Sequence, residues 1–393
     1  MRIIERVKIG LIFLLVFLMV FSYHPGIFTL VQDGGSTLVQ PIWYLFTAIT
    51  LLSLSLSILQ SKQIIWYFVL LTLFALTLFL VHAMGFPISR DYIRILLIPF
   101  CALIIGWQLK ISKKTYKALI VFFGCVVLYV AASQIYTNIG AFVIESQYLV
   151  QGKNALGVIV ATSVVAFIVL FLQKENNKLF NVFCLALAIL AFVLLLTMRA
   201  RAAMLMTLLI VVFVIYKNFV RSGNKYFFLS VVLTIFSLLA IYIVLPEAAK
   251  TYILDSFFYA REDDIISGRG ERNRMAIEFL QDNLFFGNIR DLVYVPWIHN
   301  FPLLLAYNFG IIAGFGAIAI YFYLSVVIIK AMLKYDIFEI KNIGFVLIAV
   351  AFGIGMAEPM APFGPGTVFV FSFITFGIAL RHNYKPKENS AHK

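Results

Sequence analysis

Apolar runs of about 17–25 residues recur along most of the chain, and they constrain its fold more than any other feature. Each run is long enough to cross the hydrocarbon core of a bilayer as one helix. Hydrophobic residues make up 63% of the 393 residues and charged residues 12%, whereas soluble domains average about 45–50% and about 25%. A backbone in lipid must satisfy its own hydrogen bonds, so we expect an all-α, polytopic membrane helical bundle.

The placement of these runs predicts about twelve transmembrane helices, with both chain ends in the cytoplasm. Nine fall in residues 1–245 and three in residues 303–381. Residues 246–302 form the one long connection, an external loop expected to carry a substrate-binding and catalytic helix, and residues 382–393 form a basic cytoplasmic tail. The predicted spans are 9–23, 40–59, 64–84, 92–109, 115–134, 154–172, 179–198, 202–217, 226–245, 303–329, 343–357 and 366–381.

Basic residues separate into two groups when they are counted in alternate connections. One side holds twenty, of which sixteen are Lys, and the positive-inside rule assigns that side to the cytoplasm. This distribution accounts for the net charge of +13 without nucleic-acid binding, since the sequence has no soluble basic domain to carry it. The other side holds eleven, of which nine are Arg: Arg90, Arg94, Arg199, Arg201, Arg261, Arg269, Arg272, Arg274 and Arg290.

The excess of Arg on the outer side predicts that an anion binds there. A guanidinium is a planar fork that suits phosphate and carboxylate, whereas the Lys ammonium is a point charge. Several of these Arg stand at the ends of apolar runs, where an unpaired charge is costly and usually functional. The alternative is that their side chains extend to lipid headgroups and bind no substrate.

The densest polar segment of the outer loop contains Arg269, Arg272 and Asn273. If a helix begins there, these three residues share one face through three- and four-residue spacing. They would also lie beside free N–H groups, which favour anions. The segment therefore predicts a phosphate site, and the alternative is an amphipathic helix lying on anionic lipid. The full segment reads Ser267-Gly268-Arg269-Gly270-Glu271-Arg272-Asn273-Arg274.

His299-Asn300 closes the same loop, directly before the tenth predicted span. A histidine near the membrane surface can act as a general base or hold a sugar hydroxyl, and the alternative is a hydrogen-bonded interface residue. The acidic residues 262–264 could bind a metal ion, but we interpret them as a solvated patch that balances nearby Arg. The first outer connection, residues 24–39, has Asp33 as its single acidic residue, so no paired carboxylates are expected there.

Three stretches together resemble the family of O-antigen polymerases and O-antigen ligases, which act on lipid-linked glycans at the outer face of the membrane. The segment at 197–203, Thr-Met-Arg-Ala-Arg-Ala-Ala, is similar to the family's short Thr/Ser-Arg-small motif. Ser267-Gly268-Arg269 is followed by Gly287 eighteen residues after the Arg, the spacing from the family's Ser-Gly-Arg to its closing Gly. The third stretch is similar to the family's His-Asn-x-x-Leu…Gly sequence and contains His299, Asn300, Leu303, Gly310 and Gly314.

A fourth segment, Lys-Asn-Ala-Leu-Gly at 153–157, is similar to an Asn-x-Leu-Gly sequence that opens a middle span of the family. The resemblance covers about residues 150–320. The chain departs from the family at Asn273, where many members have Trp, and at Leu284, where they have Pro. Either Arg199 or Arg201 matches the family's essential Arg, and the two alanines that follow favour Arg201.

The resemblance implies a metal-independent, inverting glycosyltransferase without a cofactor, in the bacterial inner membrane with its active site facing the periplasm or exterior. The donor would be an undecaprenyl-pyrophosphate-linked oligosaccharide, and the acceptor a lipid-linked glycan or the lipid A core. Membrane lipids and a chain-length regulator protein are the further partners expected. The implied catalytic residues are Arg201 and Arg269, which would stabilise the leaving pyrophosphate, and His299, which would act on the acceptor hydroxyl. The implied substrate-binding residues are Arg199, Arg272, Asn300, Arg90, Arg94 and Arg290.

The acceptor separates the two activities of this family. A polymerase adds the glycan to another lipid-linked repeat, whereas a ligase moves it onto the lipid A core. The compact chain favours an O-antigen or capsular repeat polymerase.

Outside the family, twelve spans with both ends inside also suit a transporter or lipid-linked glycan flippase. The six-residue connection at 173–178 is not the long central loop of that class. A non-enzymatic membrane scaffold is a further alternative, but it would not explain the excess of Arg on one side.

Overall fold

The computed structural model describes residues 3–25, 27, 39–54, 60–85, 91–137, 153–198, 200–222, 247, 269–289, 298–358, 362–363 and 369–384. Within these ranges the chain is helical and contains no strand. The helices are α1 Ile3–Phe21, α3 Val39–Ser53, α4 Lys62–Ala83, α5 Asp91–Gln108, α6 Lys113–Thr137, α8 Lys153–Phe171, α9 Lys178–Thr197, α10 Arg201–Ser222, α13 Arg269–Asn283, α14 Phe301–Lys334, the 3-10 helix Ile340–Asn342, α15 Ile343–Gly355 and α16 Val370–Tyr384.

The positions of these helices follow the apolar runs of the sequence. Every predicted span coincides with a helix except 226–245, which lies outside the described residues. Among the described helices, six are long and apolar enough to cross a membrane, namely α4, α6, α8, α9, α10 and α14. The all-α class is therefore confirmed, and these long apolar helices indicate a membrane-embedded protein. The total of twelve crossings and their orientation stay predictions.

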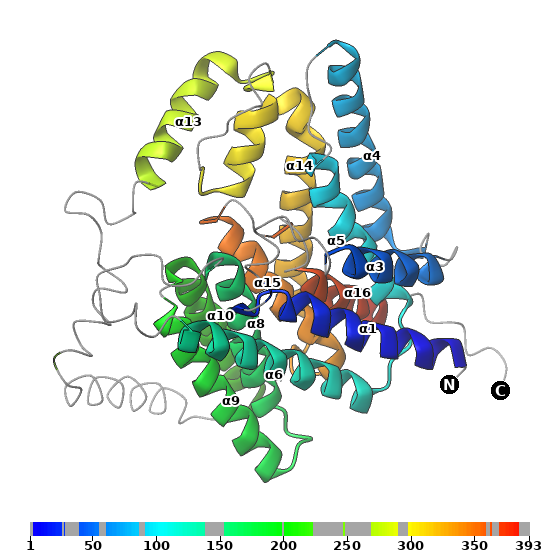
Figure 1. Ribbon diagram of the computed structural model, residues 1–393, viewed down its shortest axis with the longest axis vertical. Coiled ribbons are helices and arrows are strands. Elements are labelled where there is room, and N and C mark those ends of the chain that lie inside the picture. The colour runs from blue at the N-terminus through cyan, green and yellow to red at the C-terminus, as the bar shows by residue number, and fades with distance from the viewer. Residues whose placement is uncertain are drawn as a thin grey trace.

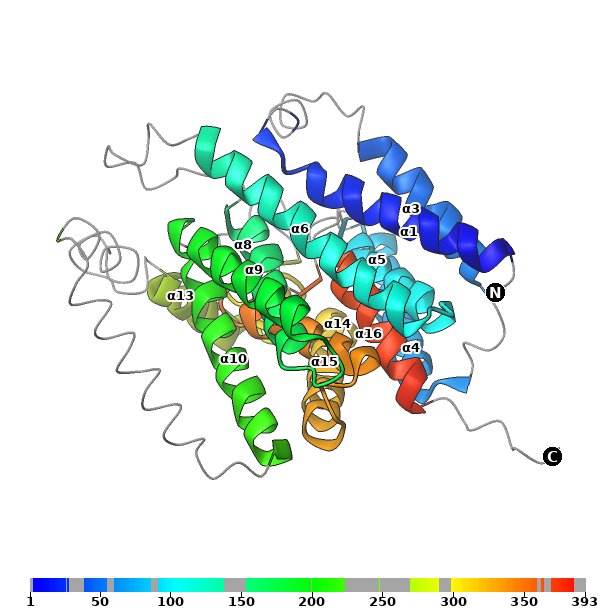
Figure 2. The same ribbon diagram turned by 90° about the horizontal axis from the view of Figure 1, so that it is seen from below.

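The helices run in two main directions. Helices α1 and α6 lie side by side in both views (Figures 1 and 2). Helices α4 and α14 also pack on each other, but they follow the long axis of Figure 1, across the direction of α1 and α6. Helix α13, the predicted helix of the external loop, packs against α14 at one end of the molecule (Figure 1).

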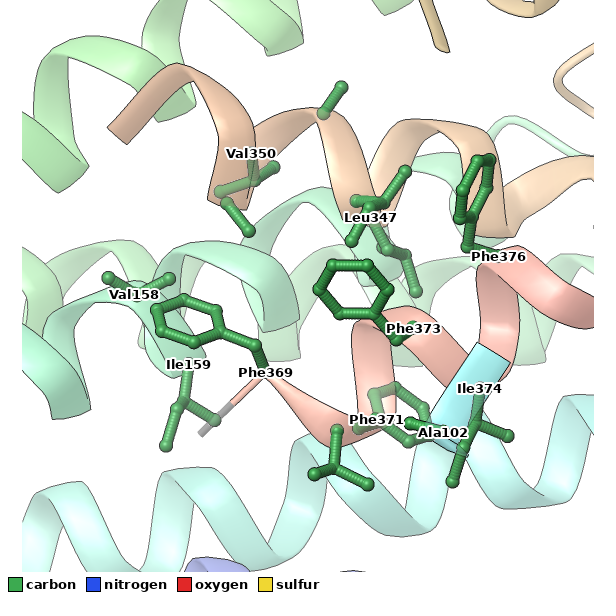
Figure 3. Close-up of a cluster of buried hydrophobic side chains, with 14 of the residues drawn as sticks. Ala102, Val158, Ile159, Leu347, Val350, Phe369, Phe371, Phe373, Ile374 and Phe376 are labelled. Carbon is green, nitrogen blue, oxygen red and sulfur yellow. The ribbon is translucent and has the colours of Figure 1, made fainter. Parts of the chain in front are cut away.

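The core lies where α15 and α16 pack between α5 and α8. All side chains of α16 from Val370 to Leu380 are buried, as expected for a helix that is apolar on every side. Figure 3 shows Phe373 of α16 against Leu347 of α15, with residues of α5 and α8 beside them. On the other flank of α16, the ring of Phe371 stacks on that of Phe123 in α6, with their centroids 3.9 Å apart.

Glycines let the backbones of the core helices approach closely. A Cβ on Gly377 of α16 would lie 2.3 Å from the carbonyl oxygen of Leu103 in α5. A Cβ on Gly344 of α15 would lie 2.0 Å from the carbonyl oxygen of Thr375 in α16. Both distances are too short for any side chain, so α16 touches its two neighbours through glycine, as helices in membranes often do.

Polar contacts at one end of the molecule join segments that the sequence assigns to the cytoplasmic side. Arg221 at the end of α10 pairs with Asp336, just after α14, with 3.4 Å between their charged atoms. Arg381 near the end of α16 donates a 3.1 Å hydrogen bond to the carbonyl oxygen of Trp107 near the end of α5. The side of the membrane on which these contacts lie stays a prediction.

The glycine contacts predict that an added methyl group will change the stability of the protein differently at two positions. We expect Gly377→Ala to lower the free energy of unfolding by about 1–3 kcal/mol, because its Cβ overpacks the α5–α16 contact. Gly10 of α1 is the matched control, since a Cβ there would meet no heavy atom within 4 Å. Gly10→Ala should be neutral or stabilising by about 0.5–1 kcal/mol, through the lower backbone entropy of alanine. Thermal unfolding of both variants in mild detergent measures the difference, and equal changes would contradict the packing described.

Candidate functional site

A polar cluster lies where α8 and α14 begin and α15 ends. The side chain of Asn154, in the first turn of α8, donates a 3.1 Å hydrogen bond from Nδ2 to Oε2 of Glu358. Nδ1 of His299, two residues before α14, lies 3.7 Å from the same oxygen. Only 13% of the His299 side chain and 8% of the Glu358 side chain are exposed. Three segments far apart in the sequence therefore contribute one buried group of side chains.

Asn300 holds two of these segments together. Its Oδ1 accepts a 3.0 Å hydrogen bond from the backbone N–H of Leu303, which caps the N-terminus of α14. Its Nδ2 donates a 3.1 Å hydrogen bond to the carbonyl oxygen of Met356, directly after α15. The start of α14 is thereby tied to the end of α15, and this tie places His299 beside Glu358. The structure gives Asn300 a positional role, and its predicted contact with substrate stays a prediction.

The carboxylate of Glu358 is buried, and a buried charge without compensating partners is costly. The amide of Asn154 provides a hydrogen bond to the charged oxygen, and the imidazole of His299 lies within ion-pair distance. The N-terminus of α8 also favours a negative charge near its first turn. These three features stabilise an acidic group inside the protein, three residues after the end of α15.

Arg201 opens α10 at the same end of the molecule. The start of α10 packs directly on the start of α8, since a Cβ on Gly157 would lie only 2.6 Å from the Cβ of Ala200. Gly157 is one helical turn after Asn154, so Arg201 begins its helix close to the turn that holds Glu358. Helix α10 also packs against α15. Asn154, Arg201 and His299, which the sequence analysis singled out separately, are thus brought to one end.

Helix α13 is attached to α14 through a pair of glycines. Helix α14 is interrupted at Gly310, which has a φ of 62°. The turn after α13 fits against this break: the N–H of Ile311 donates a 2.8 Å hydrogen bond to the carbonyl oxygen of Leu284. Gly287 in that turn has a φ of 56°, and a Cβ on it would lie 2.4 Å from the backbone nitrogen of Gly310. Positive φ and close approach both require glycine here, so the two glycines dock α13 on the segment that starts at His299.

The predicted Arg residues with described side chains lie in different surroundings. Arg272 is exposed on α13. Asn273 beside it is partly buried, and its Oδ1 accepts no hydrogen bond from the described residues. Arg94 is exposed on α5, and its guanidinium lies over the ring of Trp43 in α3, 5.4 Å from the centroid. That contact suits a charge anchored at a membrane interface as well as a substrate site.

Several predicted site residues fall outside the described residues. These are Arg90, Arg199 and Arg290, together with residues 262–264, 267 and 268. The backbone of Arg269 opens α13, but its side chain is not described. Their predicted roles stay predictions. In the described part of the chain, no three His, Cys, Asp or Glu side chains are grouped as metal ligands.

Sequence analysis missed Glu358, the residue that joins the cluster. A signal for it does exist, because Glu358 is the single acidic residue between 340 and 387 and directly follows the predicted span 343–357. An isolated ionisable residue at the end of an apolar run marks a candidate functional site.

Comparison of the chain with models of known protein families found no match, and comparison with curated proteins found none either.

The cluster predicts strong energetic coupling between Asn154 and Glu358. A double-mutant cycle of Asn154→Ala and Glu358→Ala should give a coupling of about 1.5–3 kcal/mol, as expected for a hydrogen bond to a charged group. The matched control is the exposed pair Arg274–Glu278 on α13, whose charged atoms lie 3.5 Å apart. Its coupling should be about 0.3–0.5 kcal/mol. Equilibrium unfolding in mixed detergent micelles provides the free energies, and equal coupling in the two pairs would show that the buried contact does not form.

Proposed function

We propose that this protein is a membrane glycosyltransferase that moves an undecaprenyl-pyrophosphate-linked glycan onto an acceptor at the outer face of the bacterial inner membrane. The observation that carries the proposal is the meeting of three resemblance segments at one end of the helical assembly. Residues 153–157 begin α8, residues 200–203 begin α10, and His299-Asn300 precede α14. The first two touch through Gly157 and Ala200, and the first and third share Glu358.

The anionic donor is supported by the helix ends that gather there. Helices α8, α10 and α14 all begin at this end, and helix N-termini favour negative groups such as pyrophosphate. Arg201 stands at the start of α10, and Arg269 and Arg272 belong to α13. In the proposed reaction these Arg stabilise the charge that develops on the departing pyrophosphate, as preorganised cations do at other phosphate sites.

The proposed transfer is a single displacement. His299 accepts the proton of the acceptor hydroxyl while that oxygen attacks the anomeric carbon of the donor glycan. The bond from the anomeric carbon to the pyrophosphate oxygen breaks, and the lipid pyrophosphate leaves with the bonding electrons. The configuration at the anomeric carbon is inverted. The residues that act are Arg, His and Glu of this chain, and the reaction calls for no cofactor.

The proposed acceptor is a second lipid-linked repeat, which makes the protein an O-antigen or capsular repeat polymerase. A chain-length regulator protein and the surrounding lipids complete the proposed set of partners. Transfer to the lipid A core is the alternative within the same chemistry, and it would make the protein a ligase.

The proposal predicts a large loss of transfer in specific variants of the purified protein. In nanodiscs supplied with a lipid-linked repeat, we expect Arg201→Ala to lower turnover about 10²–10³-fold, through lost charge stabilisation. His299→Ala should lower it about 10²–10⁴-fold, through the lost base. Arg274→Ala is the matched control, since Arg274 is exposed on α13 and already paired with Glu278. Glycan size on a gel is the readout.

The same gel separates the polymerase from the ligase. A ladder of long glycans on the carrier lipid supports the polymerase, and product formed only when lipid A core is added supports the ligase. Movement of the lipid-linked repeat across the bilayer without elongation would instead establish a flippase. Wild-type turnover in both variants would contradict the catalytic roles proposed.

A further inference from the structure

We propose that Glu358 is a positioning residue for His299. In this arrangement the carboxylate faces Nδ1 of the imidazole, so Nδ1 carries the proton and Nε2 is the basic nitrogen. This role rests on the proposed function in one respect: the proton that Nε2 accepts is that of the acceptor hydroxyl. It makes a separate statement about the imidazole, which can be tested in the absence of any substrate.

The geometry distinguishes the two nitrogens of the imidazole ring. Nδ1 of His299 lies 3.7 Å from Oε2 of Glu358, and Nδ1 has no hydrogen-bond partner among the described residues. The two side chains are 13% and 8% exposed, so bulk water screens their interaction little. The carboxylate is therefore the charged group nearest to Nδ1 in the described contacts of this histidine.

The chemistry of the two groups then fixes the position of the proton. A neutral imidazole has one N–H donor and one acceptor nitrogen, whereas an ionised carboxylate only accepts. A nitrogen that faces a carboxylate is stable as the N–H donor, which leaves the opposite nitrogen as the base. A separation of 3.7 Å is longer than a hydrogen bond, and such contacts often shorten once substrate is bound. When Nε2 takes up a proton, the same carboxylate stabilises the imidazolium.

Asn154 completes the arrangement by holding the carboxylate. Its Nδ2 donates to Oε2, the same oxygen that faces His299, so this one oxygen contacts both partners. Asn154 belongs to α8, His299 precedes α14, and Arg201 begins α10, which packs against α8 and α15. Asn154 thus acts through Glu358, and Glu358 acts through His299.

A second His–Glu pair provides an internal control. Nε2 of His382 lies 2.9 Å from Oε1 of Glu339, at the end of the molecule where Arg221 pairs with Asp336. These two side chains are 31% and 36% exposed. The residue types are the same, but this pair is more exposed, and Glu339 lies after the end of α14, whereas His299 lies before its start.

The first test reads the tautomer directly. The full-length protein, labelled with ¹⁵N in its five histidines, is placed in nanodiscs, and His299→Asn identifies the signals of His299. We expect the Nδ1–H tautomer in the wild type. In Glu358→Gln, the oxygen that faces both Asn154 and Nδ1 of His299 loses its negative charge, so the preference for Nδ1–H weakens and the signals should change toward the Nε2–H tautomer. Glu339→Gln should leave the His299 signals unchanged. An Nε2–H tautomer in the wild type would overturn the proposal, even if Glu358→Gln fails to fold.

The second test separates positioning from a structural role. Glu358→Gln should lower kcat at least about tenfold, with the KM for the lipid-linked donor within about twofold, since general-base catalysis contributes about 10²–10⁴-fold. In a His299→Ala background it should cause no further loss. Glu339→Gln should leave turnover unchanged. A loss that multiplies with that of His299→Ala would overturn positioning. If the wild type transfers no glycan at all, the proposed function fails, and the tautomer alone then decides whether Glu358 positions His299.

Discussion

An acidic side chain inside an apolar helical protein requires partners, and Glu358 obtains them from two distant segments. Asn154 provides a hydrogen bond to its carboxylate, and His299 provides an imidazole within ion-pair distance. Without these partners the charge would be unstable in its buried position. The requirement ties together the start of α8, the approach to α14 and the end of α15. The other features of the site, including the position of Arg201, follow from which helix ends these ties bring together.

Close packing through glycine determines which parts of neighbouring helices lie level with one another. Gly157 brings the start of α10 against the start of α8, and Gly310 interrupts α14 so that the turn carrying Gly287 can dock against it. Gly157 lies about one helical turn from Asn154, and Gly310 about three turns from His299. All three glycines belong to the segments on which the resemblance rests. In the structure these glycines set the distances between helices, and those distances determine where the nearby polar residues lie.

The helices could be predicted well from the sequence because each one depends on the pattern of its own residues. Long apolar runs identified the helices, and the spacing of charged residues identified α13 within the external loop. Local pattern does not determine how helices cross, since helices such as α15 and α16 are apolar on every side and offer no preferred face. The directions of α4 and α14 relative to α1 therefore became evident only in three dimensions.

The candidate site was predicted in part, for a similar reason. Asn154, Arg201 and His299 stand in short motifs, so a sequence can indicate them one by one. Glu358 acquires its role from a residue 204 positions away in the chain, and no local pattern records such a contact. Asn300 has a structural role that its motif did not indicate, because its amide caps α14 and donates to the carbonyl oxygen of Met356.

We propose one site around Glu358 at the outer face, built from residues of α8 and α10 and from the segment before α14. The most direct measurement is a cryo-electron microscopy map of the protein in nanodiscs with a lipid pyrophosphate bound. We expect the Glu358 carboxylate to lie between Asn154 and His299. The pyrophosphate should lie beside Arg201, on the side of the membrane opposite to Arg221 and Asp336. A map with Glu358 facing lipid, or with the pyrophosphate bound at the other end of the helices, would contradict it.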